Sequence, residues 1–232
     1  EQIAAHRELD LPEPLLSLTL GRKLPIERVE DWLIDGSDGL IRARLYANHN
    51  EKDAPLILYF HGGGFVNHGI EDFDRVCRRL AISTGAVVFS VDYRMAPEHV
   101  FPAAHDDALA SFSWVRARAT ELGADEDKIF VMGDSAGGNL ATSICRQTLA
   151  ANHPMPRGQI LIYPVTDATM SQPSVETFAN APLLTRDHMN FSLDTYLSDR
   201  ENEQRDDRIS PLLAADLSGL PPALVITATV DP

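Results

Sequence analysis

The sequence predicts an α/β fold in which a mostly parallel sheet is flanked by helices. Short apolar runs rich in β-branched residues alternate with segments of helical spacing along most of the 232 residues. Strands that alternate with helices pair in parallel through right-handed crossovers. Two of the runs also end in glycine-rich turns, at residues 61–65 and 133–137. Because parallel strands present ligand sites at their carboxyl ends, both turns are expected at one edge of the sheet.

The expected elements follow from periodicity and turn residues. Residues 1–27 contain a leucine-rich helical pattern, and residues 29–34 and 40–46 alternate around an Asp-Gly-Ser-Asp-Gly hairpin signal. The remaining elements are a strand at 55–60, a helix at about 72–84, a strand at 86–91, a helix at about 103–122, a strand at 128–132, a helix from 135 to about 151, and strands at 159–163 and 223–228.

Composition and charge restrict the class of protein. Apolar residues make up 44% and charged residues 23% of the chain, as in ordinary globular domains, and the net charge of −14 argues against nucleic acid and anionic membranes as partners. No apolar run approaches the length of a membrane span, and residues 1–25 lack a signal-peptide pattern. Cys77 and Cys145 are expected to be free thiols in a reducing, cytoplasmic compartment, and no ligand cluster supports a metal site.

The Gly-Asp-Ser-Ala-Gly motif at residues 133–137 lies between a predicted strand and a predicted helix. In that context Gly-x-Ser-x-Gly is typical of a nucleophile elbow, a turn so tight that the serine takes strained angles and its neighbours must lack bulk. The Ser135 hydroxyl would project above the sheet, beside a helix N-terminus that stabilises negative charge. An ordinary turn is the alternative, and the flanking strand and helix favour the elbow.

The His-Gly-Gly-Gly-Phe turn at residues 61–65 follows another predicted strand. Attack on an acyl carbonyl creates an oxyanion that needs preorganised donors, and glycines let backbone N–H groups approach it closely. A flexible turn or a phosphate-binding loop are the alternatives, but the turn has neither G-x-G-x-x-G spacing nor a Gly-Lys-Ser/Thr sequence. The two turns together predict a nucleophile and an oxyanion hole.

Several motifs, in a fixed order, carry a resemblance to one enzyme family. They lie at residues 61–65, 92–99, 101–104, 133–141, 163–164 and 220–232. On these motifs the chain resembles the hormone-sensitive-lipase family of α/β hydrolases, in the branch whose elbow reads Gly-Asp-Ser-Ala-Gly. The resemblance covers most of the chain from about residue 30 onward. It implies a single α/β-hydrolase domain over residues 1–232, a helical cap, and catalysis without a cofactor.

The resemblance also implies roles for individual residues. Ser135 matches the nucleophile, and Asp231 matches the acid of the catalytic triad. The amides of Gly63, Gly64 and Ala136 match the oxyanion hole.

The position of the general base departs from the family pattern. The triad order in this fold is Ser, acid, His, yet all eight histidines precede Asp231. His61 and His99 lie in turns that favour scaffold roles, and nothing around His188 recommends it as the base. We therefore expect the chain to be a fragment that is trimmed or incompletely traced after the acid. Such a fragment would lack the C-terminal strand and helix of the fold and be nearly inactive.

The segment between the strands at 159–163 and 223–228 interrupts the alternation of strands and helices. Residues 187–198 have helical spacing, and residues 199–207 are highly charged. By resemblance, residues 1–27 and about 166–219 form a cap over the active site. A surface excursion without a catalytic task is the alternative.

The expected function is hydrolysis of esters of short to medium acyl chains through a serine acyl-enzyme, with a small-molecule ester as the substrate. A ligand-binding protein on a hydrolase fold is one alternative, since plant gibberellin receptors resemble this family and lack the catalytic histidine. An amidase or acyltransferase with the same machinery is the other. Asp134 is expected to brace the elbow and not to serve as the triad acid.

The last predicted strand suggests self-association. In the family fold, further elements cover the edge of the strand at 223–228, where Leu224, Val225 and Ile226 follow one another. An uncovered edge offers unpaired backbone groups and apolar surface to another chain. We therefore expect a homodimer or a higher association.

Overall fold

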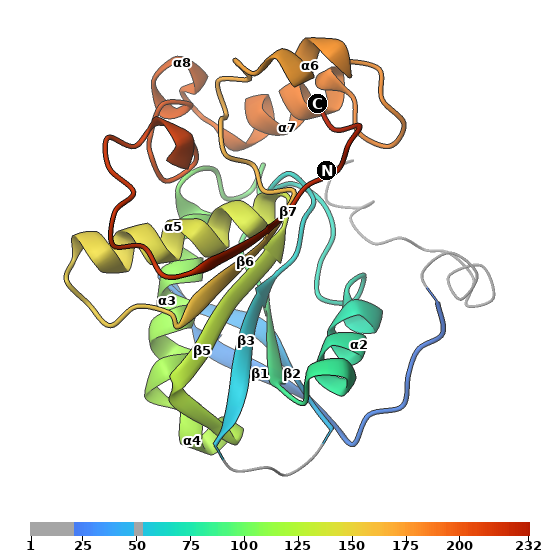
Figure 1. Cartoon of the computed structure of the whole chain (residues 1–232), viewed down its shortest axis with the longest axis vertical. Helices are drawn as coiled ribbons and strands as arrows, with labels where there is room; N and C mark the ends of the chain where they lie inside the picture. The colour runs from blue at the N-terminus through green and yellow to red at the C-terminus, as the bar shows by residue number, and fades with distance from the viewer. Residues whose placement is uncertain (1–20, 49–52) are drawn as a thin grey trace.

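The computed structural model describes residues 21–48 and 53–232, so the leucine-rich pattern predicted within residues 1–20 lies outside the described residues. A seven-stranded sheet of order β1-β2-β4-β3-β5-β6-β7 forms the centre of the described chain (Figure 1). Its strands are β1 (Arg28–Asp35), β2 (Leu40–Ala47), β3 (Ala54–Phe60), β4 (Val87–Asp92), β5 (Ala124–Asp134), β6 (Gly158–Ile162) and β7 (Ala223–Ile226).

The sheet is mostly parallel, as the sequence predicts. The five strands from β4 to β7 run parallel, whereas β1 pairs antiparallel with β2 and β2 pairs antiparallel with β4. Phe60 at the end of β3 is in register with Gly133 near the end of β5. The turns that follow these two strands therefore leave the sheet side by side at its carboxyl edge.

Helices cover both faces of the sheet. Helix α2 packs on one face, and α3 and α5 pack together on the other (Figure 1). Helices α6 and α7 lie beyond the carboxyl ends of the strands, in the segment between β6 and β7 (Figure 1). The bounds are α2 (Asp74–Thr84), α3 (Ala103–Ala117), α4 (Ala119–Leu122), α5 (Ala136–Ala150), α6 (Pro173–Thr177), α7 (Arg186–Tyr196), α8 (Arg200–Glu203) and the 3-10 helix η2 (Pro211–Leu213).

Several predicted elements differ in their bounds, and the strand predicted at 223–228 ends at Ile226. The helix expected at 103–122 is divided at Arg118, whose φ of −119° and ψ of 14° leave the helical region. The elbow strand expected at 128–132 extends over Ala124–Asp134, because residues 125–128 are charged and mostly exposed and carry no apolar signal. The charged stretch at 199–207 contains the short helix α8, which the side chain of Asp199 caps at its N-terminus.

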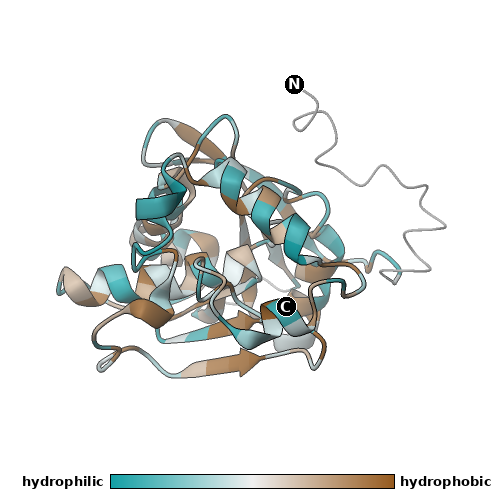
Figure 2. Ribbon diagram, turned by 90° about the horizontal axis from the view of Figure 1, so that it is seen from above, coloured by the Kyte–Doolittle hydropathy of each residue, from teal (hydrophilic) through white to brown (hydrophobic). Residues whose placement is uncertain are grey.

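The apolar core has a part on each face of the sheet. The larger cluster fills the space between the sheet and helices α3 and α5, and the smaller lies under α2. The helices seen from above carry both hydrophobic and hydrophilic residues, as expected of helices with one buried face (Figure 2). Cys77 in α2 and Cys145 in α5 are buried and form no disulfide, and burial raises the pKa of each thiol to about 12.

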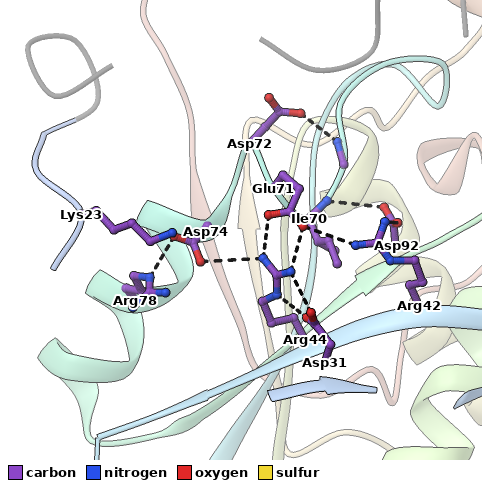
Figure 3. A network of polar contacts seen from close by, with 11 residues as sticks. Lys23, Asp31, Arg42, Arg44, Ile70, Glu71, Asp72, Asp74, Arg78 and Asp92 are labelled. Carbon is purple, nitrogen blue, oxygen red and sulfur yellow. Dashed lines mark hydrogen bonds and ion pairs between the residues drawn. The ribbon is translucent and has the colours of Figure 1, made fainter. Parts of the chain in front are cut away.

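A polar network ties the β1–β2 hairpin to the segment before α2 (Figure 3). The Arg44 guanidinium donates to Asp31 at 2.5 and 3.1 Å and to Glu71 at 2.7 and 2.8 Å. Asp74, at the first turn of α2, pairs with Arg78 at 2.8 Å and Lys23 at 3.0 Å. The Arg44 side chain is only 11% exposed, whereas those of Asp31 and Glu71 are 64% and 43% exposed, so the guanidinium is covered and its carboxylate partners face water.

Within the segments that the structure describes, no helix is both long enough and apolar enough to cross a membrane.

Candidate active site

The turn between β5 and α5 holds Ser135 in a strained conformation. Its φ of 52° and ψ of −118° lie outside the regions that side-chain-bearing residues favour. A Cβ on Gly133 would stand 2.2 Å from the carbonyl carbon of Gly137, and a Cβ on Gly137 would stand 1.9 Å from the Phe60 carbonyl oxygen. Both glycines of the motif are therefore required by close backbone approach, which also places the elbow against the end of β3.

Backbone hydrogen bonds fix Ser135 on both sides. Its N–H donates to the Ile162 carbonyl at 2.8 Å, and its carbonyl accepts from Asn139 N at 3.1 Å and Val165 N at 3.2 Å. The residue is half-buried, with its hydroxyl at the N-terminus of α5. The turn thus holds a partly exposed serine on a fixed backbone.

The glycine turn after β3 lies beside this elbow. Gly63 has a φ of 126° and Gly64 a φ of 62°, and the Gly63 carbonyl accepts from Val66 N at 3.1 Å and Asn67 N at 2.9 Å. Among the described residues, the amides of Gly63, Gly64 and Ala136 donate no backbone hydrogen bond. All three N–H groups belong to the two adjoining turns, and they are available to a bound oxygen atom.

Asp134 connects the elbow to the glycine turn. Its Oδ1 accepts from the Tyr59 hydroxyl at 2.6 Å and from Gly62 N at 3.1 Å. Burial raises the pKa of this carboxyl above its ordinary value, and the hydrogen bonds from Tyr59 and Gly62 oppose that shift. The contacts are those of a residue that braces the turn.

His61 is enclosed within the glycine turn. Its Nδ1 bonds to the Gly62 carbonyl at 2.7 Å, and its ring stacks on Tyr93 with centroids 4.5 Å apart. The Tyr93 hydroxyl also donates to the His61 carbonyl at 2.7 Å. Burial lowers the pKa of His61 to about 4, so the ring is neutral near pH 7. These contacts shape the turn from within.

Asp231 follows β7, which is separated from the strand of Ser135 by β6 alone. The residue is partly exposed, and burial raises the pKa of its carboxyl. Burial also raises the pKa of the neighbouring Tyr163, with smaller contributions from the charges of Asp134 and Asp231. The structure brings Asp231 to the same edge of the sheet as Ser135, but no hydrogen bond joins the two side chains.

The described histidines form no hydrogen bond with the Ser135 hydroxyl, and His6 and His49 lie outside the described residues. Their positions are buried for His61 and His105, intermediate for His68, and exposed for His99, His153 and His188. The structure therefore pairs the nucleophile with no base among the histidines that it describes.

The segment between β6 and β7 meets the glycine turn through one face of α7. A Cβ on Gly64 would stand 2.5 Å from Ser192 Oγ, and the rings of Phe65 and Tyr196 stack with centroids 4.3 Å apart at an angle of 12°. Sequence reasoning missed Tyr196 and its partners His105 and Asn139. No motif signals these contacts, because they join residues 34 and 91 positions apart.

No group of three or more His, Cys, Asp or Glu side chains within the described part of the chain is arranged to hold a metal ion.

Comparison with known proteins gives consistent matches. A family model for the alpha/beta hydrolase fold matches residues 57–232. The chain is 41% identical to the carboxylesterase NlhH of Mycobacterium tuberculosis over 99% of this chain and 70% of NlhH. It is 40% identical to the carboxylic ester hydrolase LipN of the same organism, over 88% of this chain and 56% of LipN. The chain thus spans little more than half the length of LipN.

A solved structure agrees with these matches. An esterase of Pyrobaculum calidifontis superposes with a TM-score of 0.86 at 46% identity, over 89% of this chain and 68% of that esterase.

Proposed function

The chain belongs to the α/β-hydrolase family, and on that premise we propose that it hydrolyses carboxylic esters through a serine acyl-enzyme. The observation that carries the proposal is the strained Ser135, with a φ of 52°, beside three backbone amides that have no backbone acceptor within the described residues. The similarity to the carboxylesterases NlhH and LipN supports it. The proposed substrates are small esters with short to medium acyl chains.

In the proposed mechanism the Ser135 Oγ attacks the ester carbonyl. The amides of Gly63, Gly64 and Ala136 donate to the developing oxyanion, the alcohol leaves, and water releases the acid from the acyl-enzyme. Asp231 orients a histidine that acts as the base, in the triad order of this fold.

The polypeptide of these 232 residues is proposed to be nearly inactive by itself, because no histidine in the described segments hydrogen-bonds to the Ser135 hydroxyl. An oxyanion hole and substrate binding alone leave a residual acceleration on the order of 10³–10⁴-fold over water. Assay of this polypeptide beside the whole protein, with p-nitrophenyl esters, tests the proposal. Equal turnover in both would overturn it and would assign the base to an upstream histidine.

Two further features complete the proposal. The segment 166–219, with α6, α7 and α8, serves as a cap over the site, supported by the contacts of α7 with Gly64 and Phe65. The protein works in a reducing, cytoplasmic compartment, supported by two buried thiols that form no disulfide.

Replacement of the nucleophile tests the central assignment. In the whole protein, Ser135→Ala should lower turnover of p-nitrophenyl butyrate by roughly 10⁴-fold or more, since a covalent nucleophile is lost. Ser113→Ala is the matched control, because the exposed Ser113 hydroxyl bonds only to the Leu109 carbonyl. A phosphonate inhibitor should add its mass at Ser135 and at no other serine. Undiminished turnover by Ser135→Ala would sink the proposal.

The alternatives predict different results in the same assays. An acyltransferase would give more ester than acid product when a competing alcohol is added. A ligand-binding protein would bind an ester-like ligand equally well before and after the Ser135→Ala substitution and would release no alcohol.

A further inference from the structure

A buried polar trio joins three helices of the molecule. His105 lies in α3, Asn139 near the start of α5, and Tyr196 at the end of α7, and each is 0% exposed. The Tyr196 hydroxyl lies 2.9 Å from His105 Nδ1, and His105 Nε2 lies 2.8 Å from Asn139 Oδ1. Buried polar groups such as these are directional and must be satisfied, so they favour one arrangement of the three helices.

The partners of Asn139 determine the tautomer of His105. Asn139 Nδ2 donates to the carbonyls of Val165 and Ile209, each at 2.8 Å, which leaves Oδ1 as the acceptor toward His105. His105 therefore carries its proton on Nε2 and donates it to Asn139. Its Nδ1 is then an acceptor, and the Tyr196 hydroxyl must be the donor. Every polar atom along this line has a defined role.

On one side the trio reaches the backbone of the nucleophile. The amide N–H of Asn139 donates to the Ser135 carbonyl at 3.1 Å, and Val165 N donates to the same oxygen at 3.2 Å. The Val165 carbonyl in turn accepts from the Asn139 side chain. The Asn139 side chain thus closes a ring of hydrogen bonds around the Ser135 carbonyl and holds Val165, one of its two donors, in place.

On the other side the trio reaches the glycine turn. The Tyr196 ring stacks on Phe65, the residue after Gly64, at 4.3 Å, and Ser192 one helical turn earlier lies against Gly64. The Tyr196 carbonyl accepts from Phe101 N at 2.8 Å, and the Phe101 ring meets that of His105 at 5.2 Å. Tyr196 therefore touches the glycine turn with its ring and holds His105 with its hydroxyl.

We propose that His105 and Tyr196 are positioning residues through which helix α7 holds the nucleophile turn and the glycine turn in register. The proposal rests on the proposed ester hydrolysis and concerns the geometry of that same site. Electrostatic stabilisation of an oxyanion requires donors placed in advance at its position, and a small displacement of the nucleophile relative to those donors lowers the rate steeply. Helix α7 contacts the glycine turn directly and reaches the nucleophile turn through His105 and Asn139, so it can set their separation.

The neutral state of His105 suits this task. Burial lowers its pKa to about 4, with a hydrogen bond to Asn139 opposing the shift and the charge of Arg208 adding to it. The charge of Asp206 and a hydrogen bond with the Arg208 backbone also oppose the shift in pKa. The tautomer needed by both partners is consequently retained across the neutral range.

Three variants test the trio in the whole protein. Tyr196→Phe keeps the ring that stacks on Phe65 and removes only the hydroxyl, and we expect kcat for p-nitrophenyl butyrate to fall about 10-fold with KM changed less than 3-fold. His105→Gln keeps a donor toward Asn139 and should retain more of kcat than His105→Asn, which keeps only an acceptor toward Tyr196. Tyr46→Phe is the matched control, because its buried hydroxyl lies in the smaller core cluster under α2, outside the trio and both turns.

Thionoesters, in which sulfur replaces the carbonyl oxygen, distinguish the contact of the trio with Phe65 from its contact with the Ser135 backbone. Sulfur is a weak acceptor, so the preference for the ester over the thionoester reports the alignment of the oxyanion donors. Tyr196→Leu, which removes the stack on Phe65, should lower that preference about 10-fold. Tyr196→Phe should leave it within 2-fold of wild type, because its effect acts through Ser135.

The results separate positioning from a purely structural role. If Tyr196→Phe and both His105 variants lower the melting temperature yet keep wild-type kcat below it, the inference is overturned. Equal loss of kcat in Tyr46→Phe would overturn it as well. Failure of the proposed function has a different signature, namely wild-type turnover that does not depend on Ser135. In that case the trio has no reaction to serve, and the inference falls with it.

Discussion

At the scale of the residue, two glycines with positive φ differ in whether a side chain would fit. Gly63 combines a φ of 126° with a backbone so close that a Cβ would stand 2.0 Å from the Asn67 carbonyl oxygen. Gly39, in the β1–β2 hairpin, has a φ of 95°, but a Cβ added there would meet nothing within 4 Å. The two glycines therefore separate steric exclusion from backbone preference.

Gly63→Ala should lower the turnover of ester far more than it lowers the free energy of unfolding. The added Cβ must push the 63–67 turn apart, and this displaces the donors, so we expect turnover to fall more than about 100-fold. Gly39→Ala should cost about 1 kcal/mol of unfolding free energy through its positive φ and leave turnover unchanged. Ester hydrolysis and urea denaturation of both variants provide the test. Wild-type turnover in Gly63→Ala would contradict the proposed role of this turn.

Asp134 gives a prediction about pH. Burial raises the pKa of its carboxyl in the folded protein above the unfolded value of about 3.9, so ionisation above that value disfavours the fold. Asp134→Asn keeps an oxygen acceptor for Tyr59 and Gly62 without the charge. The unfolding free energy of the variant relative to wild type should therefore rise between pH 4 and pH 7.

Urea denaturation at the two pH values measures this difference. Asp127→Asn, at an exposed site, controls for the general effect of removing one negative charge. If the difference in unfolding free energy between Asp134→Asn and wild type does not change with pH, the raised pKa of Asp134 is not its cause.

Residues of the site could be predicted from the sequence where the backbone conformation restricts the residue type. Glycines flank Ser135 because the turn leaves no room for side chains, and that restriction is visible in the sequence. The trio of His105, Asn139 and Tyr196 carries no such restriction. Its members meet only because α3, α5 and α7 pack against one another, and side-chain contacts between distant segments leave no local pattern.

At the scale of the element, the strands and helices were predicted well where burial is periodic. The hairpin of β1 and β2 and the strands β3 to β7 occur where apolar runs predict them, because a buried strand requires such a run. The division between α3 and α4 was missed, since the residues around Arg118 are compatible with one continuous helix. The exposed start of β5 was missed because exposed strand residues need not be apolar.

Arg44 links elements through a largely buried guanidinium, and its removal should lower the free energy of unfolding. Arg44→Met removes four hydrogen bonds to Asp31 and Glu71, whose side chains are 64% and 43% exposed, and we expect a loss of about 2 kcal/mol in unfolding free energy at pH 7. Arg28→Met is the control, because Arg28 pairs with one carboxylate, Glu30, and its own side chain is 21% exposed against 11% for Arg44. An exposed pair of this kind contributes less than about 1 kcal/mol. Equal losses in the two variants would contradict the assignment.

The same network makes acid stability depend on Arg44. The hydrogen bond from Arg44 lowers the pKa of Asp31, against the opposing effect of burial. A carboxyl with a lowered folded pKa stabilises the fold above its unfolded pKa of about 3.9, and this stabilisation is lost as the pH falls further. The difference in unfolding free energy between wild type and Arg44→Met should therefore become smaller below about pH 4. Urea denaturation between pH 3 and pH 7 measures this difference.

At the scale of the whole molecule, the edge strand β7 exposes apolar side chains. On β7 the side chains of Leu224, Val225 and Ile226 are 56%, 53% and 45% exposed. A parallel strand exposed on both faces is unusual, because such strands are ordinarily covered on each side. We propose that β7 pairs with β7 of a second copy, since its outer edge offers unpaired backbone groups.

Light scattering over a dilution series tests this association for the 232-residue polypeptide. We expect a dimer at micromolar concentration, and Leu224→Lys with Ile226→Lys should give a monomer. Leu33→Lys is the matched control, because Leu33 is 63% exposed on β1 at the opposite edge of the sheet. A wild-type polypeptide that remains monomeric up to millimolar concentration would contradict the proposal.

The burial of Cys77 and Cys145 makes the molecule suitable for site-specific labelling. They are the only two cysteines in the sequence, and with a pKa raised to about 12 neither thiol offers a reactive thiolate to a maleimide dye at neutral pH. Leu183, fully exposed between α6 and α7, is a natural attachment point. Leu183→Cys would carry a single fluorophore, whose emission could follow the movement of this segment during turnover without removal of any native residue from the core.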